Sequence, residues 1–172
     1  MGGTTGRQSK KYAPPIKQWD AARIERDKQL KKIYGFKNKR ELWKEESFLR
    51  TIRKRVRELI GLKAIGKGAE EEKIFLKMLS DFGLVKKDAV LDDVLDLKLE
   101  NVLDRRLQMI VFKRGMAPTI KSARQLIVHG HVLVGDRVVT SPSYLVKTWE
   151  EETINYVDPK FAYKPNTENK AE

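Results

Sequence analysis

The stretch that decides the fold runs from residue 103 to residue 146 and reads LDRRLQMIVFKRGMAPTIKSARQLIVHGHVLVGDRVVTSPSYLV. Apolar residues at helical spacing predict one helix over about 99–114, ended by Gly115, and a second over 120–129, begun by Thr119 as its N-cap. A Gly135-Asp136 turn between two apolar runs predicts a β-hairpin of residues 131–134 and 137–140. Residues 144–149 and 153–157 are predicted as further strands. The expected fold class is therefore α+β and predominantly helical.

This stretch is also strongly basic, with seven Lys and Arg residues against only Asp104 and Asp136. The whole chain of 172 residues has 36 Lys and Arg against 24 Asp and Glu, a net charge of +12. Residues 1–60 carry 18 basic and 7 acidic side chains, whereas residues 61–100 carry 7 and 9. Two basic blocks thus flank a mildly acidic spacer. This pattern favours a protein that binds nucleic acid over one that is basic without such a partner.

The N-terminal half is predicted to be helical. A first helix over 18–34 ends at Gly35, and a second runs from a capping box of Asn38 and Glu41 to Gly61. A third, over 69–82, is followed by a short helix near 92–97. The apolar residues expected to face the core are Ala21, Ile24, Leu30, Ile33, Leu42, Leu49, Ile52, Val56, Leu59, Ile60, Ile74, Phe75, Met78, Leu79 and Phe82. We expect the three tryptophans, Trp19, Trp43 and Trp149, to be packing anchors.

Several classes of function find no support in the sequence. The chain contains no cysteine, so disulfides and thiolate zinc sites are impossible, and a reducing compartment is expected. Its first residues lack the apolar core of a signal peptide, and no run is apolar enough for a membrane span. The Gly66-Lys67-Gly68 turn lacks the spacing of a phosphate-binding loop. The prediction is a cytoplasmic protein without enzymatic activity, cofactor, metal or membrane contact.

Two motifs carry a specific resemblance. The order DRRL, a glycine after KR, SARQLI, GHV and a small basic hairpin resembles the S-four (S4) RNA-binding domain, and YGFKNKRELW at residues 34–43 resembles the N-terminal part of small-subunit ribosomal proteins of the S-four family, archaeal and eukaryotic type. The resemblance implies a helical N-terminal region followed by a domain of two helices and a small antiparallel β-sheet. The expected division is a flexible basic tail (1–16), the helical region (17–98), the S4 domain (99–158) and a flexible C-terminal tail (159–172).

The resemblance implies an RNA-binding face on the S4 domain, made of Arg105, Arg106, Lys113, Arg114, Lys121, Ser122, Arg124, Gln125, His129, His131 and Arg137. Recurring cations predict a second face on the N-terminal helices, made of Lys37, Lys39, Arg40, Arg50, Arg53, Lys54 and Arg57. For three of these residues an alternative to RNA contact stays open. Arg105 could instead pair with Asp104 or Glu100 on the surface. His129 could be a favourable cation at a helix end, and His131 could simply fill a strand position.

The resemblance further implies a structural constituent of the small ribosomal subunit. Such a protein binds small-subunit ribosomal RNA directly and early in assembly, at a helix junction of the 5′ domain, with a bearing on translational accuracy. Its implied neighbours are the S-five protein and messenger RNA on its way into the ribosome. The alternatives are a free-standing S4-domain RNA chaperone and an RNA-modification factor. The second would need a catalytic domain, for which the charged helical region offers no site.

Overall fold

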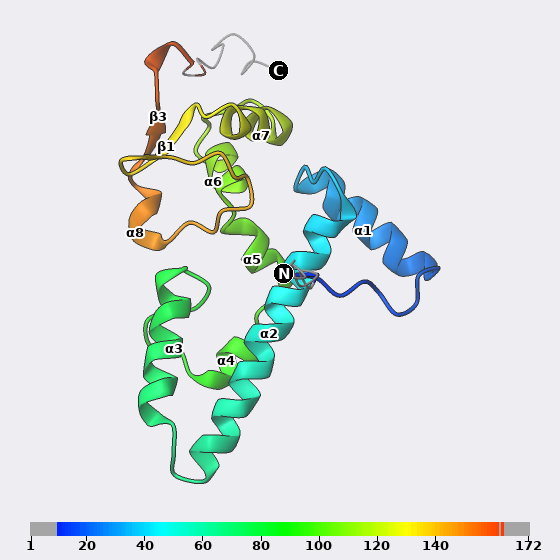
Figure 1. Ribbon diagram of the computed structural model, residues 1–172, viewed down its shortest axis with the longest axis vertical. Coiled ribbons are helices and arrows are strands. Elements are labelled where there is room, and N and C mark those ends of the chain that lie inside the picture. The colour runs from blue at the N-terminus through cyan, green and yellow to red at the C-terminus, as the bar shows by residue number, and fades with distance from the viewer. Residues whose placement is uncertain (1–9, 162, 164–172) are drawn as a thin grey trace, which may run out of the picture.

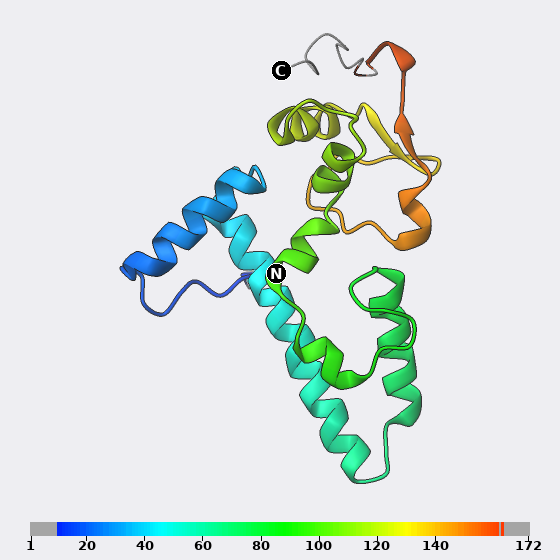
Figure 2. The ribbon, with the colours of Figure 1, turned by 180° about the vertical axis from the view of Figure 1, so that it is seen from behind.

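The computed structural model describes residues 10–161 and residue 163 (Figure 1). The helices are, in chain order, α1 (Ala21–Ile33), α2 (Lys39–Ala64), α3 (Ala69–Asp81), α4 (Leu91–Leu95), α5 (Leu99–Asp104), α6 (Leu107–Lys113), α7 (Ile120–Val128), α8 (Thr148–Glu151) and the 3-10 helix η1 (Pro159–Phe161). The 26-residue α2 is the longest, with α1 at one end and α3 and α4 along its other half. Helices α6 and α7, α8 and the sheet form a second body, which α5 joins to the first (Figure 2).

The sheet has three short antiparallel strands in the order β2-β1-β3. The central strand, β1 (Val132–Val134), pairs with β2 (Arg137–Val138) through a two-residue turn, and with β3 (Ile154–Tyr156) on its other side. Gly135 has a φ of 60°, the left-handed conformation that such a tight turn requires and that favours glycine. The predicted hairpin and the α+β, predominantly helical fold class are confirmed.

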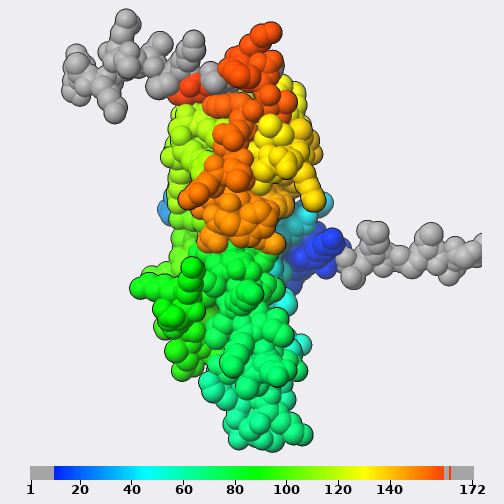
Figure 3. Space-filling model, turned by 90° about the vertical axis from the view of Figure 1, so that its left-hand side faces the viewer, coloured from blue at the N-terminus to red at the C-terminus, as the bar shows by residue number. Residues whose placement is uncertain are grey.

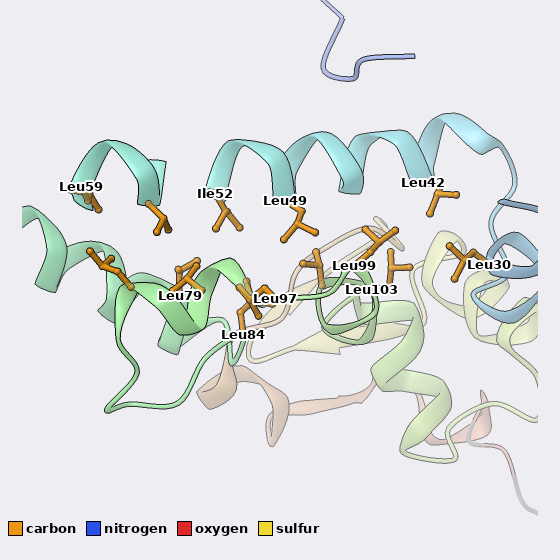
Figure 4. Close-up of a cluster of buried hydrophobic side chains, with 14 of the residues drawn as sticks. Leu30, Leu42, Leu49, Ile52, Leu59, Leu79, Leu84, Leu97, Leu99 and Leu103 are labelled. Carbon is orange, nitrogen blue, oxygen red and sulfur yellow. The ribbon is translucent and has the colours of Figure 1, made fainter. Parts of the chain in front are cut away.

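Two hydrophobic cores meet in the middle of the chain. In the first core, a row of side chains from α2 faces α3, α4, α5 and the segments between them (Figure 4). In the second core, α6 and α7 pack against β1 and β3. Leu103 belongs to the first core and Leu107 to the second, so only three residues separate them. These three, Asp104, Arg105 and Arg106, are charged, but they are too few to act as a flexible linker between the two bodies.

The single helix predicted over 99–114 is wrong, because the chain breaks at residues 105–106. Arg106 is extended, with φ −72° and ψ 140°, and forms an isolated antiparallel bridge with Leu145. The Leu107 amide donates to the Tyr144 carbonyl (2.8 Å), and the Val146 amide donates to that of Arg105 (3.0 Å). These tertiary bonds take the place of helical ones. The strand predicted over 144–149 is reduced to this bridge, since α8 already begins at Thr148.

Two helix ends also differ from prediction. Helix α2 continues through Gly61 to Ala64, because Gly61 keeps helical geometry and the positive φ falls at Gly66. Asn38 is the extended N-cap residue, but its side chain makes no capping hydrogen bond. The predicted capping box is therefore wrong, and the Glu41 carboxylate is used elsewhere. Gly35, Gly83, Gly115 and Gly130 do end helices with positive φ, as expected.

Several apolar side chains expected in the core are exposed. Trp19 is 90 % exposed and Trp149 63 %, so neither is a packing anchor. Ile33, Ile60, Ile74 and Met78 also reach the surface. The reason is that α1 and α3 each contact α2 along a narrow line: α1 buries only Asp27 and Leu30, and α3 only Leu79. Periodicity finds the apolar face of a helix but not the width of its contact.

The chain ends were expected to be flexible tails, and residues 1–9, 162 and 164–172 lie outside the described part. Within it, the Tyr12 ring lies 6.0 Å from that of Trp43, and the Ala13 amide donates to Ser47 Oγ. Tyr12 and Ala13, near the start of the described chain, thus lie against α2. On the opposite side of the molecule, the α8 segment lies against the end of α3 (Figure 3), where Thr148 Oγ1 donates to the Asp81 carbonyl.

Candidate nucleic-acid interface

One basic surface is a groove of about 770 Å³ between α1, α2 and the start of α5. We call it the arginine groove, and its cations are Arg23, Arg26, Arg50, Arg53, Arg57 and Lys98. Helical spacing explains the cluster, because residues three and four apart on α2 share one face and α1 brings its own two arginines to the same side. Only Glu46 and Glu100 add negative charge to the lining.

The cations of this groove differ in whether another protein group pairs with them. Arg23 pairs with Glu46 (2.8 Å), and Arg53 donates to the Leu97 carbonyl (2.6 Å). Arg50 and Arg57 are exposed, and no acidic side chain of the described residues pairs with them. Guanidinium groups in this state can donate paired hydrogen bonds to phosphate oxygens. The groove thus combines two fixed arginines with at least two that are available to an anionic ligand.

A second polar surface lies on α7, which we call the α7 face. Ser122, Gln125, His129 and His131 line a cleft of about 320 Å³ there, together with Leu126. The two imidazole rings stack with their centroids 6.2 Å apart. Thr119 holds the start of α7, because its side chain accepts a hydrogen bond from the Ser122 amide (3.1 Å). Hydroxyl, amide and imidazole groups at one cleft suit contacts to a nucleic-acid backbone or base edge.

A third surface lies between α1 and the start of α7. Lys28, Lys31 and Lys32 of α1 and Lys121 of α7 line a cleft of about 290 Å³ over the turn at Gly35 and Phe36. We call it the lysine cleft. Lys121 and Ser122 are consecutive residues at the start of α7, so the lysine cleft and the α7 face both use this end of the helix. Three of its lysines come from α1 and one from α7, so its shape depends on how the two bodies are placed.

Most other predicted cations are at the surface. Lys37, Arg40, Arg114 and Arg137 are exposed and Lys39 is half-buried. Lys113 pairs with Asp104 (2.9 Å), Arg114 donates to the Ile154 carbonyl (3.3 Å), and Lys54 lies 3.8 Å from Glu58. Exposed pairs of this kind cost little to break. These side chains are not gathered into one of the three surfaces.

Three arginines placed on the RNA face by sequence are engaged inside the protein. Arg106 is 3 % exposed and donates to Glu45 (2.6 Å) and Glu41 (3.5 Å), so its placement on an exposed face is wrong. Arg124 makes two hydrogen bonds to Glu41, at 2.8 and 3.0 Å. Arg105 pairs with Glu151 (2.7 Å), and not with Asp104 or Glu100. All three partners are distant in sequence, and for that reason spacing within residues 99–137 gave no sign of them.

Burial shifts the pKa values of Arg106 and its partner Glu45. Desolvation raises the pKa of Glu45 above its usual value even though Arg106 acts to lower it, and desolvation lowers the pKa of Arg106. At the same junction Tyr34 donates to Asp104 (3.3 Å), and burial together with that carboxylate raises the pKa of Tyr34 to about 12. The charges here are therefore costly to hold and depend on their partners.

Several functional candidates were not picked from the sequence. They are the remaining cations of the arginine groove and lysine cleft: Arg23, Arg26, Lys28, Lys31, Lys32 and Lys98. The signal was present, because α1 is basic on most of its circumference. What was absent from the sequence was the position of α1 beside α2 and α7.

Among the described residues, no group of three acidic or histidine side chains is arranged to hold a metal, and no described helix is long and apolar enough to cross a membrane.

A two-helix domain with a small antiparallel sheet, bordered by clustered cations, defines a protein of the S4-domain class. Residues 105–154 match the family described as "S4 domain". Three curated proteins named "Small ribosomal subunit protein uS4" are similar over most of the chain. The relative from Ignicoccus hospitalis is 46 % identical over 90 % of this chain and 92 % of its own length; that from Methanococcus aeolicus is 45 % identical (90 % and 88 %), and that from Nanoarchaeum equitans 47 % (88 % and 84 %).

The chain therefore belongs to the uS4 family of small ribosomal subunit proteins. The resemblance seen in residues 34–43 and 103–146 is confirmed at the level of the family. Its members are ribosomal proteins and not enzymes.

Proposed function

We propose that this protein binds small-subunit ribosomal RNA through the arginine groove, the lysine cleft and the α7 face. The observation that supports this most strongly is the gathering of cations from α1 and α2 in the arginine groove and from α1 and α7 in the lysine cleft. Such an arrangement suits converging RNA backbones, since each groove neutralises phosphates and the distance between grooves selects a shape. Folded RNA is recognised in this way more than by base sequence.

We further propose that the RNA site is a helix junction in the 5′ domain, and that binding occurs early in assembly. A junction brings several phosphate backbones together, and it is costly to fold until their repulsion is neutralised. A bearing on translational accuracy, contact with the S-five protein and a place near incoming messenger RNA are parts of the same proposal. We place the start of the S4 domain near residue 105, since the two cores divide there.

The direct test is filter binding of the full chain to a transcript of the 5′ domain over a series of salt concentrations. With about six to ten phosphate contacts, affinity should fall by roughly a thousandfold or more between 50 and 200 mM salt. Replacing Arg50 and Arg57 together by Gln should weaken binding. The slope of log affinity against log salt concentration should also become shallower, by the equivalent of roughly two phosphate contacts. A flat salt dependence of the unmodified protein would contradict the proposal.

A matched control is available on the same helix. Arg55 pairs with Glu71 (2.6 Å) and Lys63 with Glu72 (2.9 Å), so both point toward α3. Replacing Arg55 and Lys63 by Gln removes the same charge from α2 but leaves the arginine groove intact. We expect this variant to keep the salt dependence of the unmodified protein. Equal losses in both double variants would show that net charge matters and the groove does not.

A further inference from the structure

The two sequence motifs that carried the resemblance contact each other. Tyr34 donates to Asp104, and the Phe36 ring lies 4.9 Å from the guanidinium carbon of Arg106. Gly35 approaches so closely that a Cβ atom there would lie 2.7 Å from Ile120 Cγ2 and 2.9 Å from Gln108 Nε2. The turn between α1 and α2 is therefore fitted into the S4 domain at the break before α6 and the start of α7.

Four charged side chains continue this contact along α2. Glu45 accepts from Arg106, and Glu41 accepts from both Arg106 and Arg124. We call these four residues the junction cluster. It contains two carboxylates from α2 and two guanidinium groups from the S4 domain, and its side chains are between 3 % and 23 % exposed. Every ion pair in the cluster crosses from one body to the other.

A buried ion cluster is a poor source of stability, because desolvation of the charges offsets most of their attraction. Its geometry is demanding, however, since two arginines must meet the same carboxylate. A cluster of this kind therefore favours one relative placement of the bodies over neighbouring ones. A second contact limits rotation about it: Thr148 donates to Asp81, and the turn at Gly83 lies against the Arg105 guanidinium.

We propose that Glu41 and Glu45 are positioning residues for RNA binding. They hold α6 and α7 against α2, and so set the α7 face and Lys121 at a fixed place relative to the arginine groove and the lysines of α1. The proposal rests on the proposed function, since it assumes that one RNA contacts both bodies. Affinity then depends on the fraction of molecules in which the surfaces are correctly placed.

This role predicts an effect opposite in sign to simple electrostatics. Glu41→Gln removes a negative charge, which by itself strengthens the attraction for RNA. If Glu41 is a positioning residue, the variant instead binds the 5′-domain transcript more weakly, by about fivefold if one molecule in five keeps the placement. Its affinity for an unstructured RNA of equal length should not fall, because nonspecific binding requires no fixed placement.

Glu72→Gln is the matched control. Glu72 is also a largely buried acidic residue in an ion pair, with Lys63 (2.9 Å), but it lies on α3, away from the S4 domain. We expect this variant to bind the transcript at least as tightly as the unmodified protein. Circular dichroism of both variants confirms that the helices are retained. If Glu41→Gln binds the transcript as tightly as, or more tightly than, Glu72→Gln, the proposal is overturned.

A cycle with Arg124 separates positioning from direct contact. If Arg124 acts through Glu41, then Glu41→Gln and Arg124→Gln each weaken binding, and the double variant is no weaker than the worse single one. If Arg124 instead binds phosphate itself, Glu41→Gln frees it and strengthens binding, which contradicts the proposal. Failure of the unmodified protein to bind the transcript would count against the proposed function. That result differs from the failure of the positioning role, in which the unmodified protein binds and Glu41→Gln binds equally well or better.

A readout without RNA completes the test. The chain has no cysteine, so spin labels can be placed at single introduced cysteines, Lys67→Cys beyond α2 and Asp136→Cys in the hairpin. Both positions are exposed. The distance distribution between the labels should be narrow in the otherwise unmodified protein and broader with Glu41→Gln. An unchanged distribution would overturn the positioning role even if RNA affinity falls.

Discussion

At the scale of single residues, Arg106 is a buried cation with partners on several sides. Its guanidinium is enclosed by Glu45, Glu41 and the ring of Phe36, and its backbone is extended at the break between α5 and α6. When only the sequence is read, Arg106 is the second of two adjacent arginines inside a predicted helix and resembles a surface cation. In the fold its charge is required by Glu45, which burial would otherwise leave without a partner.

Arg106→Ala should therefore lower the free energy of unfolding by about 3–5 kcal/mol at neutral pH, since it leaves a buried carboxylate unpaired. The pKa of Glu45 is already raised by burial, so protonation relieves the penalty. The loss should be largest above that pKa and shrink as pH falls through it. Urea unfolding at several pH values measures this dependence.

Lys54→Ala is the control, because this side chain is exposed and lies 3.8 Å from Glu58. Its effect should stay within about 0.5 kcal/mol. Equal losses in the two variants would contradict the importance given to the cluster at Arg106.

At the scale of elements, the turn between α1 and α2 is closely packed against α6 and α7. Gly35 has φ 62°, and the space beside it is filled by Ile120 and Gln108. The amide group of Gln108 also donates to the Ile120 carbonyl (2.9 Å), which leaves it little freedom to move. The turn is thus specified by backbone conformation and by close approach together.

The two contributions are separable by comparing Gly35→Ala with Gly115→Ala. Gly115 has φ 72°, but within the described part of the chain a Cβ atom added there would meet no neighbouring atom within 4 Å. Gly115→Ala should cost about 1–2 kcal/mol, the conformational penalty alone. Gly35→Ala should cost roughly 1–3 kcal/mol more, because Ile120 or α7 must shift. Equal values from thermal or urea unfolding would show that the close approach is not maintained.

At the scale of the whole molecule, the two cores are joined without a linker. Leu99, Val102 and Leu103 complete the first core, and Leu107 begins the second. The turn at Gly35 and the contact of α8 with α3 connect the bodies at two further places. Domains that share so much buried contact unfold together more readily than domains on a flexible tether.

We therefore expect the slowest-exchanging amides of α2 and of α6 and α7 to report the same free energy of unfolding. Native-state hydrogen exchange at Ile52 and Val56, compared with Val111 and Ile127, measures this directly. In Arg106→Ala the free energies reported by the two sets of amides should differ, because the ion pairs of Arg106 with Glu45 and Glu41 are lost. Different values in the unmodified protein would indicate that the S4 domain opens independently.

The sequence by itself determined the elements and the family. Periodicity and glycine positions predicted most helices, Gly135 and Asp136 predicted the hairpin, and the two motifs predicted the family, since all of these depend on residues close together in the chain. Local patterns also predicted that Arg50 and Arg57 share one face of α2, where the structure places them in the arginine groove.

Only the tertiary structure decided which cations face outward and which are held inside. Glu41 seemed to cap its own helix and Arg124 to face RNA, yet the two are paired across 83 residues of sequence. The break at Arg106 likewise depends on backbone bonds from residues 144–146, which replace those of a continuous helix. An ion pair between distant residues leaves no periodic trace in a single sequence, because its energy depends on burial and distance, and both arise only when the chain has folded.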